Sequence, residues 1–101
     1  LQKGLAFYRG MQRAGMLGCL KHFPGHGNTF VDSHLGLPVI DKTADELYEN
    51  ELFPFAEAIK SIEIDSILVG HLAIPALTGS PTEAATLSAK IIKGILREQL
   101  G

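Results

Sequence analysis

Several residue types are scarce or missing in this sequence of 101 residues. It has no tryptophan and one cysteine, Cys19, so no disulfide can form within the chain. Nine basic residues stand against eleven acidic ones, and the net charge of -2 argues against a nucleic-acid partner. No apolar run approaches the roughly 18 residues of a membrane-spanning helix. We therefore expect a globular domain or part of one, with Cys19 as a small buried side chain.

Helix and strand patterns alternate along the chain. Leu5, Tyr8 and Met11 recur at helical spacing, and the unbroken apolar run Ile67–Val69 is typical of a parallel strand covered on both faces. Such alternation predicts an α/β fold with parallel strands, and two strands with three helices fit part of a (β/α)8 TIM-like barrel. The predicted elements are a helix over 1–14, a strand over 17–22, a loop over 24–38, a helix from Thr43, a strand over 65–70, a loop over 71–86 and a helix from Ser88.

Two local signals mark the middle helix. Thr43 and Glu46 have capping-box spacing, in which each side chain accepts a hydrogen bond from the backbone N–H of the other residue. Pro54 lies inside the helical pattern and lacks a backbone donor. It is expected to break or kink the helix and to start the next segment.

Both ends of the chain look internal. The sequence opens within a helical pattern at Leu1 and ends at Gly101, just after another helical pattern. Because two strands cannot close a barrel, residues 1–101 are expected to be an internal fragment of one barrel domain. Any targeting segment would then lie upstream.

The first candidate site is the stretch Lys21-His22-Phe23-Pro24-Gly25-His26-Gly27, at the end of the first predicted strand. A cation and an imidazole in this place can donate hydrogen bonds to hydroxyl groups of a ligand. The proline and glycines permit a sharp turn and close approach of the backbone to that ligand. An ordinary turn, with a solvated lysine and a histidine bonded to backbone, fits the same residues.

The second candidate is Asp32-Ser33-His34. An aspartate two residues before a histidine can hold the imidazole in one tautomer and stabilise its charged form. An unperturbed histidine titrates near ~6.5, so His34 can exchange protons close to neutral pH. His71 is a third candidate, because it follows the second predicted strand. A capped loop with an incidental histidine, and a structural role for His71, are the alternatives.

A metal site is a further alternative, since four of these residues are of types that bind zinc: His22, His26, Asp32 and His34. The spacing His-x-x-x-His suits one face of a helix, but Pro24 and Gly25 between the two histidines oppose a helix. We therefore expect no metal and no other cofactor, with a metal-dependent hydrolase as a minor alternative.

Taken together, the candidate motifs resemble glycoside hydrolase family 3, and within it the β-N-acetylglucosaminidase (β-N-acetylhexosaminidase) branch. The resemblance covers nearly the whole chain, and the blocks in this order are specific although each alone is not. Besides residues 21–27 and 32–34, the matching blocks are Leu37-Pro38, Leu52-Phe53-Pro54-Phe55, Val69-Gly70-His71-Leu72, Ile74-Pro75-Ala76-Leu77, Ala85-Thr86-Leu87-Ser88 and Leu96-Arg97.

The resemblance implies a retaining glycosidase that removes terminal β-linked N-acetylglucosamine from cell-wall or chitin-type oligosaccharides. By position, His34 matches the acid/base group of this branch and Asp32 its partner on the same loop. Lys21 and His22 match the pair that binds hydroxyls of the terminal sugar, and His71 matches a position close to the sugar.

The nucleophilic aspartate of the family is expected beyond Gly101, so the 101-residue chain by itself is expected to be inactive. Two other functions stay open. A β-glucosidase or β-xylosidase of the same family would typically use a glutamate outside this loop as acid/base, so the Asp32/His34 pair favours the N-acetylglucosaminidase branch. A noncatalytic sugar-binding relative would keep Lys21 and His22 but lack the nucleophile.

Overall fold

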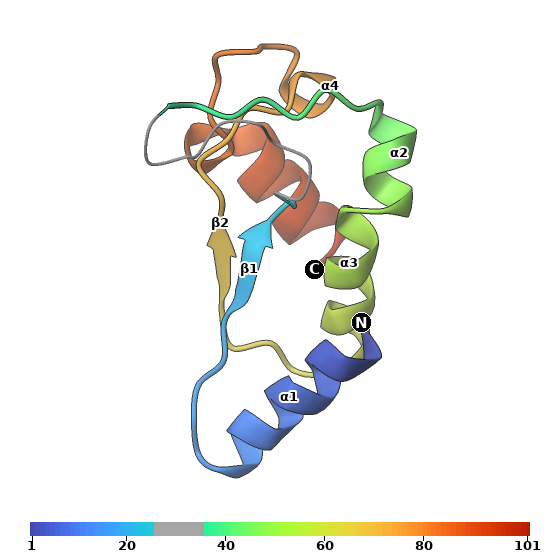
Figure 1. Cartoon of the computed structure of the whole chain (residues 1–101), viewed down its shortest axis with the longest axis vertical. Coiled ribbons are helices and arrows are strands. Elements are labelled where there is room, and N and C mark those ends of the chain that lie inside the picture. Colours follow the sequence, from blue (N-terminus) through green and yellow to red (C-terminus); the bar gives the residue numbers. More distant parts are fainter. Residues whose placement is uncertain (26–35) are drawn as a thin grey trace.

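The computed structural model describes residues 1–25 and 36–101. Two strands stand side by side and run in the same direction, so their carboxyl ends meet at one end of the molecule (Figure 1). No helix in the described part of the chain is long and apolar enough to cross a membrane. In chain order the elements are α1 Gln2–Arg13, β1 Leu20–Phe23, α2 Ala44–Glu49, α3 Leu52–Ser61, β2 Ile67–Val69, α4 Pro75–Thr78, the 3-10 helix η1 Ala85–Leu87 and the π-helix η2 Lys90–Gln99.

The predicted middle helix is observed as two helices, α2 and α3. The capping box is present: the Glu46 N–H donates to Thr43 Oγ1 (3.3 Å) and the Thr43 N–H donates to Glu46 Oε2 (2.9 Å). The break falls at Asn50 and Glu51, a little before the expected place. Pro54 lies in the first turn of α3, where its missing N–H donor leaves no helix hydrogen bond unmade.

A β-bulge interrupts the pairing of the two strands. Lys21 lies opposite Leu68 and Phe23 lies opposite Val69, so His22 is an extra residue in β1. The peptide bond between Lys21 and His22 is cis. A bulge breaks the alternation of side chains along a strand. As a result Lys21 and His22 are both exposed, whereas Phe23 is buried.

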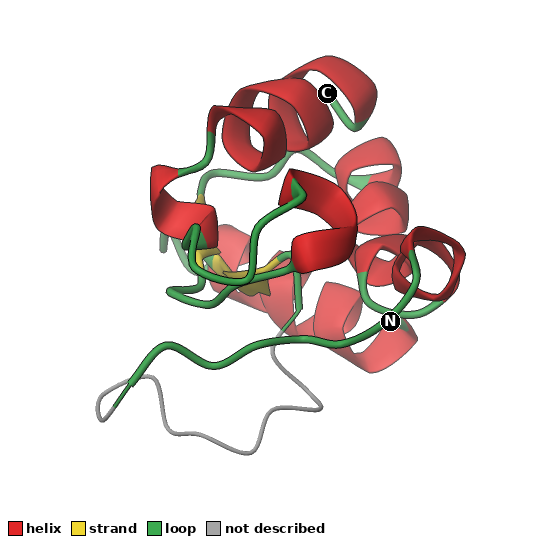
Figure 2. Cartoon of the chain, turned by 90° about the horizontal axis from the view of Figure 1, so that it is seen from above, coloured by secondary structure: helices red, strands yellow, loops and turns green. Residues whose placement is uncertain are grey.

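The hydrophobic core covers one face of the strands. Phe23 is fully buried, and its ring meets the Phe55 ring edge-on, with centroids 5.1 Å apart and planes at 86°. Figure 2, seen from above, shows the helices arranged around the short strands. Burial of these apolar side chains is the main stabilising term of the fold. The other core residues are Ile40, Leu47, Leu52, Leu72, Ile74, Ala85, Ile91 and Ile95.

The other face of the strands is exposed in the described chain. Leu68 keeps 49% of its surface exposed, and Lys21 and Cys19 are exposed as well. Within residues 1–101, contrary to expectation, Cys19 is exposed and the run Ile67–Val69 is covered on one face. The physical reason is the alternation of side chains, which places residues 19 and 21 on the side without helices.

The stretch between β2 and η2, expected to be a loop, contains the short helices α4 and η1. Pro75 begins α4, and Gly79 ends it with a φ of +81°, a conformation that favours glycine. In η2, the Leu100 N–H donates to the Ile95 carbonyl five residues earlier (3.0 Å). Ile91 and Ile95 of this helix are buried in the core.

Near the amino ends of the strands, hydrogen bonds of Asp65 connect α1 with the segments that precede β1 and β2. Its Oδ2 atom accepts hydrogen bonds from the Gly18 N–H (2.8 Å) and the Tyr8 hydroxyl (3.1 Å). The Asp65 N–H in turn donates to the Tyr8 hydroxyl oxygen (2.7 Å). The bond from Gly18, with further ones from Tyr8 and Gln12, lowers the pKa of Asp65. A Cβ at Gly18 would come within 2.5 Å of the Tyr8 ring, so this contact requires glycine.

We expect Asp65→Asn to destabilise the protein near neutral pH and to have a smaller effect in acid. A carboxyl group whose pKa is lowered by folding stabilises the fold above its unfolded value, near 3.8. That contribution is lost as the pH falls through the lower folded value. Urea unfolding of both proteins between neutral pH and about pH 3 measures this difference in stability. Asp41→Asn, at an exposed position, is the control. A stability difference that is the same at every pH would contradict this expectation.

Candidate active site

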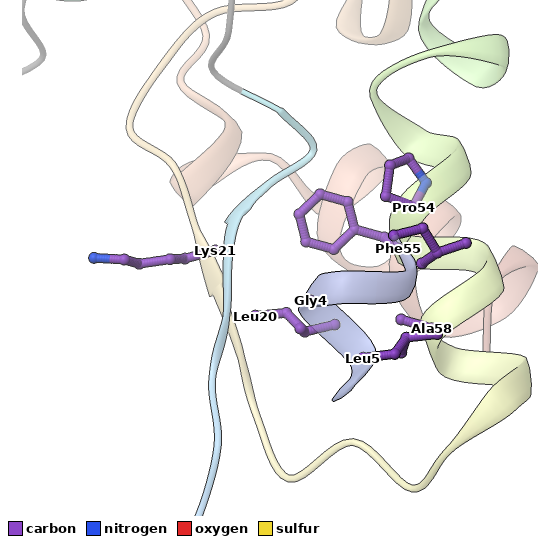
Figure 3. Close-up of a pocket in the computed structure, with 8 residues that line it drawn as sticks. Gly4, Leu5, Leu20, Lys21, Pro54, Phe55 and Ala58 are labelled. Carbon is purple, nitrogen blue, oxygen red and sulfur yellow. The ribbon is translucent and has the colours of Figure 1, made fainter. Parts of the chain in front are cut away.

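The carboxyl end of β1 presents two polar side chains in sequence, Lys21 and His22. Figure 3 shows the Lys21 side chain pointing away from Leu20 and Phe55, which lie on the side of the helices. The bulge makes His22 exposed as well, where strict alternation would have turned one of the two toward the core. An ammonium and an imidazole therefore stand next to each other at this end of the strands, and both can donate hydrogen bonds to a hydroxylated ligand.

His71 follows β2 at the same end of the molecule. The Gly70 N–H donates to the Phe23 carbonyl (2.8 Å), and a Cβ at Gly70 would lie 3.3 Å from His22 Cβ. The structure thus brings the segments that carry His22 and His71 side by side. Nδ1 of the exposed His71 lies 2.7 Å from Thr86 Oγ1, a hydrogen bond that orients the ring. Thr86 was not among the candidate residues of the sequence, although it belongs to the Ala85-Thr86-Leu87-Ser88 block.

Backbone hydrogen bonds between distant segments build the rest of this end. The Ile40 N–H donates to the Ala73 carbonyl (2.9 Å), and the Ala73 N–H donates to the Pro38 carbonyl (2.8 Å). The Ala85 N–H donates to the Leu72 carbonyl (2.7 Å). The chain before α2 is therefore held against the chain after β2, which in turn holds η1.

The predicted acid/base pair, Asp32 and His34, lies outside the described residues, and so does His26. Their roles stay predictions. Within residues 1–25 and 36–101, no group of three or more His, Cys, Asp or Glu residues is placed to hold a metal ion.

An apolar cavity of about 350 Å³ lies away from these polar groups. Residues of α1, β1 and α3 line it, among them Leu5, Leu20 and Phe55 (Figure 3). Lys21 borders the cavity, but its side chain points to the opposite side (Figure 3). The cavity is therefore distinct from the candidate site, which lies at the carboxyl ends of the strands.

Comparison with known proteins decides the family. The model for the glycosyl hydrolase family 3 N-terminal domain matches residues 2–101. The chain belongs to glycosyl hydrolase family 3. Beta-hexosaminidase A of Pseudoalteromonas piscicida is 42% identical over 107 residues, which cover 97% of this chain and 18% of that protein. The chain thus spans about a fifth of the length of this family 3 relative.

Solved family 3 structures confirm the fold class. A β-N-acetylglucosaminidase from Paenibacillus sp. str. FPU-7 has a TM-score of 0.92 and 42% identity, over 97% of this chain and 18% of that one. NagZ from Neisseria gonorrhoeae, in complex with N-trifluoroacetyl-D-glucosamine, has a TM-score of 0.84 and 36% identity, over 96% of this chain and 27% of that one. The two parallel strands and their helices are therefore part of the TIM-barrel-type domain of family 3.

Proposed function

We propose that the protein with this domain is a retaining glycoside hydrolase. It removes terminal β-linked N-acetylglucosamine from cell-wall or chitin-type oligosaccharides. The observation that carries the proposal is the 42% identity, over 97% of the chain, to a beta-hexosaminidase and to a β-N-acetylglucosaminidase. The exposed Lys21 and His22 support it, because barrel enzymes bind their substrates at the carboxyl ends of the strands.

In the proposed reaction, an aspartate outside residues 1–101 attacks the anomeric carbon, and the bond to the leaving oxygen breaks. The His34 imidazolium donates its proton to that oxygen. The neutral His34 ring then accepts a proton from water, whose oxygen attacks the anomeric carbon and displaces the aspartate. Asp32 holds the orientation of the ring and stabilises its charged form.

Lys21 is proposed to donate hydrogen bonds to hydroxyls of the terminal sugar. A hydrogen bond to a charged group contributes about 1.5–3 kcal/mol, so Lys21→Ala is expected to lower kcat/KM by about 10- to 100-fold. Steady-state kinetics on an aryl β-N-acetylglucosaminide measures this effect. Lys60→Ala, which removes an exposed lysine of α3, is the matched control and should leave kcat/KM unchanged. Unchanged kcat and KM in Lys21→Ala would refute the role of Lys21.

Thr86 is proposed to orient His71 toward the sugar. Loss of one neutral hydrogen bond is worth about 1 kcal/mol, so Thr86→Val is expected to raise KM about fivefold. Thr86→Ser keeps the hydroxyl and should restore the wild-type KM. Equal KM values in all three proteins would show that the contact between Thr86 Oγ1 and His71 Nδ1 has no part in binding.

The proposed function is tested by comparing hydrolysis of an aryl β-N-acetylglucosaminide and the matching aryl β-glucoside by the complete protein. A strong preference for the first substrate is expected. Preference for the glucoside would keep the family and overturn the substrate, whereas inactivity on both would favour a noncatalytic sugar-binding protein. Activity that a chelator abolishes and zinc restores would favour the metal-dependent alternative.

A further inference from the structure

The Glu51 side chain contacts the chain on both sides of residues 26–35. Its Cβ and Cγ lie against Gly25: a Cβ at Gly25 would be 2.6 Å from each of them. Its Oε1 atom forms an ion pair with Nζ of Lys42, the residue before the N-cap of α2. Gly25 precedes residues 26–35 and Lys42 follows them, so one side chain contacts both flanks.

The backbone position of Glu51 is fixed by the core. Glu51 lies at the junction of α2 and α3, and the next residue, Leu52, is 1% exposed. Leu47 on α2 and Phe55 on α3 are also buried. Close-packed interiors resist displacement, so the junction is a rigid base from which Glu51 reaches the two flanking segments.

The burial of the Glu51 carboxylate is unusual for a charged group. Its side chain is 13% exposed, and its Oε2 atom is buried without a hydrogen-bond partner in the part of the chain that the structure describes. By comparison, the ion pair between Glu57 and Lys60 within α3 is exposed. A buried carboxylate oxygen without a donor lowers stability, so packing alone does not account for a glutamate at position 51.

We infer that Glu51 is a positioning residue for the acid/base group of the proposed glycosidase reaction, an inference that rests on the proposed function. Gly25, with a φ of +133°, has no room for a side chain, so Glu51 packs directly against the backbone that follows β1. The ion pair with Lys42 holds the chain just before α2, together with the backbone hydrogen bond from Ile40 to Ala73. Asp32 and His34 lie between these two points in the sequence, so a change at Glu51 acts on both flanks of the stretch that carries the predicted acid/base pair.

The test compares Glu51→Gln with Glu57→Gln in the complete protein. Glu57→Gln is the control: it makes the same substitution, on α3, and removes the ion pair of Glu57 with Lys60. The readout is kcat/KM on two N-acetylglucosaminides: an alkyl glycoside, whose leaving oxygen needs a proton, and a dinitrophenyl glycoside, whose leaving group departs without one. A small displacement of a catalytic group lowers rates by up to about 100-fold, so Glu51→Gln should lower the alkyl-to-dinitrophenyl ratio by about 10- to 100-fold. Glu57→Gln should leave the ratio unchanged.

The ratio separates positioning from stability, because it does not depend on the fraction of enzyme that is folded. If Glu51→Gln keeps the wild-type ratio, the inference is overturned even where both rates fall. A wild-type protein inactive on both glycosides overturns the proposed function and this inference with it. If Glu51→Gln does not fold, Lys42→Gln breaks the same ion pair and leaves the Gly25 contact intact, and an unchanged ratio in that variant overturns the inference.

Discussion

Replacing His34 with alanine in the complete protein is expected to lower kcat/KM on an alkyl β-N-acetylglucosaminide by about 10²- to 10⁴-fold, the usual contribution of general acid catalysis. On a dinitrophenyl N-acetylglucosaminide, kcat/KM should change little, because this leaving group needs no proton. On that substrate kcat should fall, since breakdown of the glycosyl-enzyme requires the neutral imidazole to activate water. Azide, a nucleophile that needs no base, should restore it.

His26→Ala is the matched control for this prediction. It is the same substitution at a histidine of the Lys21–Gly27 stretch, to which the proposed reaction assigns no proton transfer. We expect His26→Ala to keep the wild-type rates on both substrates. Near-normal turnover of the alkyl glycoside by His34→Ala would show that another group is the acid. Loss of activity in both variants, with restoration by zinc, would favour the metal alternative.

Replacing Phe23 with alanine is expected to lower the free energy of unfolding by about 3–5 kcal/mol, the usual loss when a large buried aromatic side chain is truncated. Phe23 is fully buried, and its ring is in edge-to-face contact with the Phe55 ring. Phe23 also follows His22 directly, so the cavity would open behind the candidate site. Urea unfolding of the complete protein, followed by circular dichroism, measures the change.

Phe23→Leu is the control that separates the cavity from the loss of an aromatic ring. It keeps most of the apolar volume and should lower stability by less than half as much as the alanine variant. A loss below about 1 kcal/mol for Phe23→Ala would show that the site collapses around the smaller side chain. Equal losses for the two variants would instead assign the stabilisation to the contact between the rings.

Local sequence patterns predicted which helices and strands exist better than they predicted where each one begins and ends. The capping box of Thr43 and Glu46 was predictable, because it involves only residues three apart. The start of β1 was not: the predicted strand begins at residue 17, whereas the observed one begins at Leu20. Gly18 instead donates its N–H to Asp65, which lies 47 residues away. No short-range pattern reports such a contact.

Some residues of the candidate site were predictable from the sequence, and others were found only in the structure. Lys21, His22 and His71 were named from the order of motifs along the chain, and the family comparison confirms the resemblance that those motifs carry. Thr86 was not named from the sequence, because its hydrogen bond to His71 Nδ1 joins residues 15 positions apart. Glu51 carried no signal at all, since an acidic residue next to a helix start is normally solvated.

The sequence by itself determined which chemical groups are available, because side-chain identity and motif order are properties of the chain. It also determined where most helices form, through capping and apolar periodicity. Only the tertiary structure decided which groups share one end of the strands and which are buried. The exposure of both Lys21 and His22 depends on a bulge that exists only when β1 pairs with β2, and the burial of Glu51 depends on Gly25 and Lys42 meeting at the α2–α3 junction. Strand register and burial are set by contacts between distant segments, which no local propensity encodes.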